Sequence, residues 1–389
     1  MKLAVLKETR VGERLIALTP DIVAKLQGDG FSVVVEAGAG VEANYPDALY
    51  EAVGATIAPT AAAALDGAGI VVRVNAPTTE EALALPDGCL HLSFLQPTNS
   101  VDAVKAMAAK NVTAVSFDLL PRISRAQSMD ALSSQATVSG YRSGLAAAEY
   151  QSKFFPMLMT AAGTIPPAKV LVMGVGVAGL QAIATARRLG AVVKAYDVRA
   201  AAKEEAESLG AQFLDLGVKD EGAGGYASEL TPEEVAQQQA ALAAEVAASD
   251  VVITTAAVPG RKAPILVTRA AIEAMAPGAV VIDMAADGGG NCEPTVAGEV
   301  VTVNHAKVVG LSNPPSQMPT HASFLFARNV ANLLALFASG GELHPDYTDE
   351  VVAATAVVRG GKASTQQFAE LLGLEVAPVP SAPQEGGAA

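Results

Sequence analysis

The chain has 389 residues, more than one ordinary domain needs, and 51% of them are hydrophobic, so two or three packed domains are expected. Its formal net charge of −14 argues against a general binder of nucleic acids or anionic lipids, because both are polyanions. The two cysteines, Cys89 and Cys292, lie far apart without metal-ligand spacing. The sequence therefore predicts neither a metal site nor a disulfide scaffold, and it suits a reducing cytosol.

Two long uncharged runs raise the question of a membrane span, which needs roughly 20 predominantly apolar residues. Residues 170–186 are only 17 and contain three glycines, and residues 308–327 contain three prolines, a His and an Asn. The N-terminal apolar stretch is four residues before Lys7, too short for a signal peptide. We expect a cytoplasmic protein with no direct membrane insertion.

Short apolar runs alternate with helical stretches through the N-terminal third of the chain. Thr19-Pro20 predicts the start of a helix that ends near residue 28, and another helix is expected over 100–110. Strands are expected at residues 3–6, 32–35, 70–74, 91–94 and 113–116. This order predicts a parallel sheet with helices on both faces.

A second alternating set lies between two long helical patterns. The proline-free stretch 130–154 and residues 321–337 are the helices, and strands are expected at 169–173, 192–197, 251–254 and 280–283. We therefore predict an α/β fold in which two Rossmann-like, doubly wound parallel-sheet domains are joined by two long helices, with a cleft between them.

The domain boundaries follow from this pattern. Residues 1–132 plus 321–376 form the first, discontinuous domain, and residues 133–320 form the second, nucleotide-binding domain. The segment 220–230 is polar and rich in glycine, which indicates a mobile loop. Residues 377–389 are rich in Pro, Ala and Gly and are expected to be a flexible tail.

A glycine-rich turn follows the first strand of the second set. Gly174, Gly176 and Gly179 form G-x-G-x-x-G between that strand and a predicted helix. The first glycine allows a tight turn, the second admits a pyrophosphate, and the third permits close helix packing. The helix N-terminus then offers N–H groups to the phosphates.

The next strand ends at Asp197, 18 residues past Gly179. A carboxylate there can accept both hydroxyls of an adenosine ribose and would repel a 2′-phosphate. NAD(H) is therefore favoured over NADP(H), although Arg199 lies near enough to meet a 2′-phosphate. A packing turn without a ligand is the alternative, but every element of the fingerprint is present.

Residues 121–135 combine two Arg, two Gln, an Asp and several Ser between a strand and a long helix. One interpretation is a solvated loop in which Asp130 or Ser128 caps the helix. The other is a loop that orients a nicotinamide, whose carboxamide needs both donors and acceptors. Such a loop would hold the ring at a reactive distance from its partner, roughly 3–3.5 Å.

Several segments together resemble the NAD(H)-binding component of proton-translocating nicotinamide nucleotide transhydrogenase, in the form that is a separate α1 subunit. The resemblance extends over residues 1–375, and Arg-Ala-Gln-Ser-Met-Asp at 125–130 is its most specific segment. The other matching segments are residues 7–10, 74–77, 122–135, 174–179, 196–199, 224–227, 253–256 and 289–292.

The resemblance implies roles for individual residues. Arg122, Gln127, Asp130 and Ser133 would form the catalytic set that holds the nicotinamide end. Gly225 and Tyr226 would belong to a mobile loop that closes over the nucleotide. The further cofactor-binding positions are Ile123, Ser124, Gly174, Gly176, Val177 under the pyrophosphate, Gly179, Asp197 on the ribose, Val198, Arg199, Gln239 and Ala257.

The resemblance also implies partners. NADP(H) would bind to a partner subunit, membrane-embedded subunits would translocate protons, and the chain would be a homodimer at the cytoplasmic face of the inner membrane. Hydride passing directly between two nicotinamides involves no proton transfer at the reacting centre. The protein then needs only to bind, to orient and to exclude water.

Alanine dehydrogenase is the rival enzyme, because it shares this two-domain fold. It needs an acid/base, and we expect a Lys after residues 70–74 and a His after residues 91–94. This chain has Arg73 and Gln96 near those places, whereas Asp287 matches the dehydrogenases. His91 alternates with apolar neighbours, which is typical of a structural His. A non-catalytic NAD(H)-binding regulator is the third hypothesis.

Overall fold

The computed structural model describes residues 1–216, 232–256 and 262–378. The chain divides into unit 1, Met1–Gln135 with Met318–Ala389, and unit 2, Ala136–Gln317. The segment 220–230 lies outside the described residues, as does the expected tail from residue 379 onward. Within the described ranges, no helix is both long enough and apolar enough to cross a membrane.

The described portion of unit 1 is built on an eight-stranded sheet in the order β19-β18-β6-β5-β4-β1-β2-β3. The strands β1 to β6 pair in parallel, whereas β18 and β19 add an antiparallel edge. Their bounds are β1 (Lys2–Val5), β2 (Ser32–Glu36), β3 (Thr56–Ala58), β4 (Ile70–Asn75), β5 (Leu90–Phe94), β6 (Thr113–Ser116), β18 (Ala356–Arg359) and β19 (Lys362–Ala363).

Helices cover this sheet on both faces. Ala4 packs with residues of the helices α3, α4, α5 and α13, and its neighbours Leu3 and Val5 are equally buried on the other side. The helix α1 starts at Pro20, as predicted. The helices of unit 1 are α1 (Pro20–Gly28), α2 (Asp47–Ala52), α3 (Ala61–Leu65), α4 (Thr79–Ala84), α5 (Val101–Ala109), α11 (Pro319–Leu334), α12 (Glu350–Thr355) and α13 (Gln366–Leu372), and a small hairpin pairs β16 (Ala338–Ser339) with β17 (Glu342–Leu343).

Unit 2 contains a described seven-stranded sheet in the order β11-β10-β9-β12-β13-β15-β14, parallel except for β14. The strands are β9 (Lys169–Met173), β10 (Val192–Tyr196), β11 (Gln212–Phe213), β12 (Val251–Thr254), β13 (Val280–Asp283), β14 (Val300–Val303) and β15 (Ala306–Gly310). Its helices are α7 (Val177–Arg188), α8 (Ala202–Ser208), α9 (Pro232–Ala247) and α10 (Arg269–Glu273).

The alternation along β9 shows that unit 2 is doubly wound. Val170 and Val172 lie in a buried cluster with residues of α6 (Ala131–Tyr150), α7 and α8. Leu171 and Met173 point the other way, into a cluster with residues of α9 and α10. Because successive side chains of a strand point to opposite faces, helices cover both sides of the sheet. The predicted α/β class with two Rossmann-like units is confirmed.

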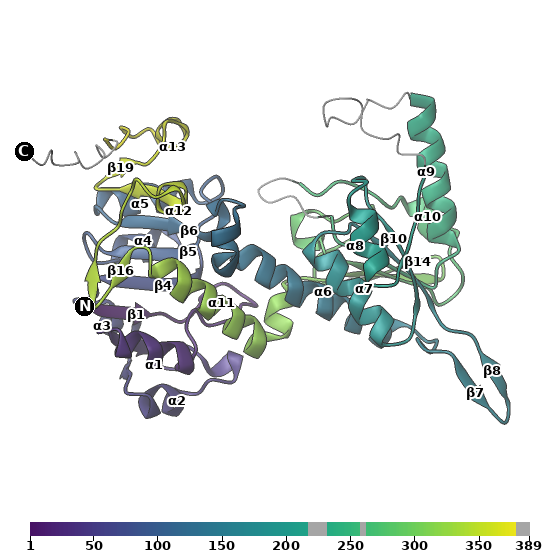
Figure 1. The fold of residues 1–389 in the computed structure, drawn as a ribbon, viewed down its shortest axis with the longest axis horizontal. Coiled ribbons are helices and arrows are strands. Elements are labelled where there is room, and N and C mark those ends of the chain that lie inside the picture. The colour runs from purple at the N-terminus through teal and green to yellow at the C-terminus, as the bar shows by residue number, and fades with distance from the viewer. Residues whose placement is uncertain (217–231, 257–261, 379–389) are drawn as a thin grey trace, which may run out of the picture. The chain divides into compact units, whose positions relative to one another are not determined.

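The structure departs from the expected elements around the first long helix. The helix α6 (Ala131–Tyr150) ends before residue 154. The amide of Gln151 stops it, because its Oε1 accepts the N–H groups of Ser152 and Lys153. A hairpin of β7 (Leu158–Thr160) and β8 (Gly163–Ile165) follows, which the sequence pattern did not predict. It projects from the body of unit 2 (Figure 1).

Candidate functional site

The glycine-rich turn joins β9 to α7 as the fingerprint requires. Gly174 has a φ of +95°, a left-handed conformation that favours glycine. A Cβ on Gly179 would lie 1.8 Å from the carbonyl oxygen of Gly174, so any side chain there would clash with backbone. A Cβ on Gly176 would meet nothing within 4 Å of the described atoms. The space beside Gly176 is therefore open to a ligand.

The N-terminus of α7 is able to receive an anion. Its first intrahelical hydrogen bond runs from Leu180 N to the Gly176 oxygen at 2.8 Å. The N–H groups of Val177, Ala178 and Gly179 therefore have no acceptor within the helix. Val177 is 42% exposed, so this helix end is accessible. N–H groups without an acceptor in their own helix, together with the positive end of the helix dipole, suit the pyrophosphate of a dinucleotide.

Asp197 follows β10 and is buried against the same turn. Its Oδ2 accepts the N–H of Val175 at 2.7 Å, and Arg199 binds both carboxylate oxygens through Nε at 3.0 Å and Nη2 at 3.1 Å. Burial raises the pKa of Asp197, but the hydrogen bonds from Arg199 and Val175 outweigh it and hold the pKa below its ordinary value. The carboxylate is therefore ionised and fixed beside the glycine turn.

Two residues without a role predicted from the sequence bind the backbone at the turn and in the segment after β12. Thr255, after β12, donates its hydroxyl to the Gly174 oxygen at 2.9 Å. The amide of Asn291 accepts the N–H of Ala256 and donates to its oxygen. Asp283 in turn accepts the N–H of Asn291 at 2.7 Å. Both Thr255 and Asn291 lie in segments that resemble the family, and that resemblance was the feature of the sequence that pointed to them.

The segment 122–133 belongs to unit 1 and contains the short helix η3 (Ser124–Met129). Asp130 then caps α6, because its carboxylate accepts the N–H of Ser133 at 2.9 Å and the hydroxyl of Ser133 at 2.6 Å. Of the two caps considered from the sequence, Asp130 is the correct one. This bond places Asp130 and Ser133 side by side.

The polar side chains of this segment face outward. Arg122, Ser124 and Gln127 are exposed, and Ile123 is half-buried. Within the portion of the chain that the structure describes, the side chains of Arg122 and Gln127 make no hydrogen bond. Arg125 differs, since it forms an ion pair with Asp349 at 2.7 Å. The exposed groups are thus available to a ligand or to solvent.

The remaining predicted positions divide into two groups. Val198 is 68% exposed beside Asp197, and Gln239 is exposed on α9. Gly225, Tyr226 and Ala257 lie outside the described residues. In unit 2 the structure therefore brings together the glycine turn, Val177 and the segment 197–199.

Two of the positions that would distinguish an alanine dehydrogenase, Arg73 and Asp287, form contacts within the protein. Arg73 is buried and forms ion pairs with Glu8 at 3.8 Å and with Glu81 at 2.8 Å. Burial raises the pKa of Glu8 despite the charge of Arg73. Asp287 accepts the hydroxyl of Ser312 at 2.6 Å and the N–H of Asn313 at 2.8 Å.

His91 and Gln96 also lack the features of an acid/base. His91 is fully buried in β5, with its Nε2 3.1 Å from the hydroxyl oxygen of Ser93. Burial lowers the pKa of His91 to about 3, so the ring stays neutral. Gln96 has a left-handed φ of +44°, and its N–H donates to the Asp118 carboxylate at 2.8 Å. A structural role for His91 fits these contacts.

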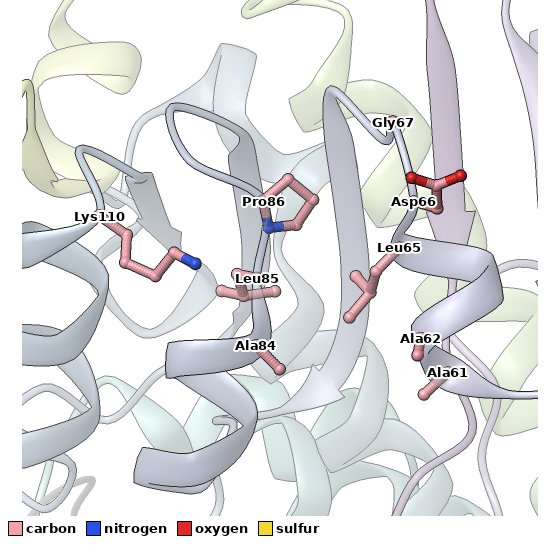
Figure 2. Close-up of a pocket in the computed structure, with 9 residues that line it drawn as sticks. All are labelled: Ala61, Ala62, Leu65, Asp66, Gly67, Ala84, Leu85, Pro86 and Lys110. Atoms are coloured by element: carbon pink, nitrogen blue, oxygen red, sulfur yellow. The ribbon is translucent and has the colours of Figure 1, made fainter.

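Unit 1 has a hollow that other residues line (Figure 2). Leu65 and Gly67 line it before β4, and Leu85 and Pro86 line it before β5. Lys110 closes the side beside α5. Because ligands of parallel sheets bind at the carboxyl ends of the strands, this hollow at the amino ends is not the expected nucleotide site.

Comparisons with known proteins agree with this geometry. The family model "Alanine dehydrogenase/PNT, N-terminal domain" matches residues 4–139, and "Alanine dehydrogenase/PNT, C-terminal domain" matches residues 143–366. The chain is 46% identical to the protein that forms the first portion of NAD(P) transhydrogenase subunit alpha in Rhodospirillum rubrum, over 93% of this chain and 97% of that protein. It is 28% identical to alanine dehydrogenase of Halomonas elongata, over 96% of this chain and 98% of the other.

Among solved structures, the transhydrogenase from Sinorhizobium meliloti superposes with a TM-score of 0.83 at 41% identity, covering 95% of this chain and 100% of that one. Both family models together match most of the sequence. The chain therefore belongs to the alanine dehydrogenase/PNT family.

Proposed function

We propose that this chain is the NAD(H)-binding subunit of a proton-translocating transhydrogenase. NADH bound here would pass a hydride directly to NADP⁺ on a partner subunit. The observation that carries the proposal is the near full-length likeness to a transhydrogenase alpha-subunit protein, 46% identical, in a chain whose dinucleotide turn is intact. The likeness to alanine dehydrogenase is weaker, at 28% identity.

In this proposal unit 2 holds most of the dinucleotide. The N–H groups at the start of α7 bind the pyrophosphate, beside the open space at Gly176. Asp197 receives the adenosine ribose, with Val198 and Arg199 close by. The further proposed cofactor contacts are Gly174, Val177, Gly179, Gly225, Tyr226, Gln239 and Ala257.

The segment 122–133 would serve the nicotinamide end. Arg122 and Gln127 present exposed polar groups, and Asp130 and Ser133 form a fixed donor and acceptor pair. Ile123 and Ser124 would add contacts to the same end. Bound NAD(H) supplies the hydride chemistry, and these residues bind and orient the ring so that little motion is left before transfer.

Hydride transfer between nicotinamides requires no protein acid/base, and the residues in the dehydrogenase positions are already engaged. Arg73 lies in a buried ion pair, and Gln96 cannot titrate. An alanine dehydrogenase is the second candidate, favoured by Asp287. The hydroxyl of Ser312 and the N–H of Asn313 both bind that carboxylate, so it has a structural function in this chain.

We infer that the partners are an NADP(H)-binding subunit and membrane-embedded, proton-translocating subunits, through which this chain would sit at the cytoplasmic face of the inner membrane. A homodimer is also proposed. The segment that leads into the hairpin β7–β8 supports it, since Met157, just before β7, and Met159, within it, are 58% and 78% exposed. Exposed large apolar side chains are often covered by a protein–protein contact.

The proposal is tested with the purified chain and its partner subunits. Titration calorimetry should show much tighter binding of NADH than of NADPH, and absorbance at the nicotinamide band should show no oxidation of alanine with NAD⁺. Addition of the partner subunits with NADP⁺ should then oxidise NADH. Turnover of alanine by the isolated chain would replace the proposal with the dehydrogenase, and NADH binding without transfer would favour a regulator.

A further inference from the structure

The carbonyl oxygen of Ser128, in η3, accepts two side-chain amides from α11. Asn329 Nδ2 and Asn332 Nδ2 each donate to it at 2.9 Å. Ser128 directly follows Gln127, and its hydrogen bonds therefore fix the backbone that carries the Gln127 side chain. Asn329 is only 6% exposed, whereas Asn332 is half-buried.

Asn329 also contacts α6 on the other side of the same turn. Its Oδ1 accepts the hydroxyl of Ser134 at 2.7 Å. Ser134 immediately follows Ser133, which is bound to Asp130. One buried amide thus donates to the backbone beside Gln127 and accepts from the helix beside Ser133, and both of its hydrogen-bonding ends are used.

We propose that Asn329 is a positioning residue for hydride transfer, which sets the distance between Gln127 and the Asp130–Ser133 pair. The inference rests on the proposed function of the segment 122–133. An amide is suited to this place because it offers a donor and an acceptor on one rigid group. Being buried, Asn329 acts through Ser128 and Ser134.

This arrangement predicts a particular kinetic effect. Loosening the turn changes the geometry of the ring-orienting groups, and an error of about 1 Å in such a group can cost up to about a hundredfold in rate. The groups proposed to bind the pyrophosphate and the ribose belong to unit 2 and are untouched. A change at Asn329 should therefore lower the rate of hydride transfer and leave the affinity for NADH nearly unchanged.

The substitution Asn329→Asp removes one of the two bonds. It keeps the shape and the oxygen that faces Ser134, but it replaces the donor that faces the Ser128 carbonyl with an ionisable oxygen, so the uncharged variant Ser134→Ala is its comparison. Measured by stopped flow with the partner subunits and NADP⁺, the transfer rate should fall by about tenfold or more. The dissociation constant for NADH, measured by titration on the same sample, should stay within about threefold of wild type.

Asn332→Ala is the matched control. It removes the other donor to the Ser128 carbonyl, while the buried Asn329 still donates to that carbonyl. Its transfer rate should fall by less than that of Asn329→Asp. Ser134→Ala removes the contact with α6 and serves if Asn329→Asp does not fold; it should show the same loss of rate without loss of affinity.

The outcomes separate the two proposals. A wild-type chain that transfers no hydride to NADP⁺ overturns the proposed function itself. A wild-type chain that transfers, with folded Asn329 and Ser134 variants that transfer equally fast, overturns the positioning role alone. Equal losses of rate and of NADH affinity would also overturn it, since they indicate a general loss of structure.

Discussion

Arg199 and Asp197 form a two-pronged ion pair that uses all the hydrogen-bonding capacity of the carboxylate. Oδ1 accepts the backbone N–H of Arg199 at 2.8 Å and its Nε at 3.0 Å. Oδ2 accepts the N–H of Val175 at 2.7 Å and Arg199 Nη2 at 3.1 Å. A carboxylate has about four acceptor positions, so ribose hydroxyls must replace the guanidinium to reach Asp197.

This pair leads to a prediction about cofactor choice. Removing the cation by Arg199→Met leaves the carboxylate uncompensated where a 2′-phosphate would approach. The affinity for NADPH should fall by about fivefold or more relative to that for NADH, because a unit charge about 4 Å away is worth about 1 kcal/mol even when water screens it fully, and more in a less solvated site. Parallel titrations with NADH and NADPH measure the ratio.

Asp197→Asn is the matched change, because it keeps the shape and removes the negative charge. It should lower the affinity for NADH and reduce the difference in affinity between NADH and NADPH. An NADPH affinity that stays constant in both variants would show that the pair does not control the choice of cofactor.

The fold was predictable where all the residues that define a motif lie together in one short segment. The strand of residues 169–173, the three glycines and the following helix lie together in sequence, and the structure places β9 and α7 there. Short strands outside the two large sheets were harder to predict. The hairpin β7–β8 is short and largely exposed, so it lacks the buried alternation that marks a strand.

The supporting contacts of the site were not predictable because they join distant segments of the chain. Asn329 and Ser128 are 201 residues apart, and Thr255 is 81 residues from Gly174. No periodicity or spacing relates such pairs, and only the fold brings them together. The sequence placed Arg199 near the 2′ position but did not predict its ion pair with Asp197, because such a local pair depends on a side-chain conformation.

Two glycines of the turn should respond in opposite ways to alanine. Gly176 has a φ of −82° and a Cβ there would have no neighbour within 4 Å, so Gly176→Ala should leave the folded state unchanged or stabilise it by about 0.4–1 kcal/mol. Its methyl group would nevertheless occupy the space proposed for the pyrophosphate, and the NADH affinity should fall by at least about tenfold.

Gly179→Ala should instead lose stability, because the methyl group would overlap the carbonyl of Gly174. The loss should be about 1–3 kcal/mol or more in urea unfolding. If Gly176→Ala binds NADH as tightly as wild type does, the dinucleotide does not approach this turn.

Gln127→Asn tests the ring-orienting segment. The shorter side chain withdraws the exposed amide while the backbone contacts of η3 remain. Hydride transfer to NADP⁺ on the partner should slow by about 10–100-fold, and the NADH affinity should stay close to wild type. Gln212→Asn, the same change on the exposed strand β11, is the control and should transfer at the wild-type rate. A wild-type rate for Gln127→Asn in stopped flow would remove this residue from the mechanism.

His91 makes the stability of the protein depend on pH. Burial lowers its pKa in the folded state to about 3, below the ordinary 6.5. Between these two values the unfolded chain binds a proton at this histidine and the folded chain does not. Stability is therefore full above pH 6.5 and falls as the pH drops below that value, by at most about 1.4 kcal/mol per pH unit. Urea unfolding at pH 7.5 and 5.5 measures this loss.

His91→Asn removes the titrating group and should flatten this region of the profile, although it lowers stability at neutral pH by disturbing the contact with Ser93. Asp197 and Glu81 do not account for a loss between pH 6.5 and 5.5. The pKa of each carboxyl is below its ordinary value, so the stability that it contributes is lost only at lower pH. An unchanged slope in His91→Asn would mean that another group carries the dependence.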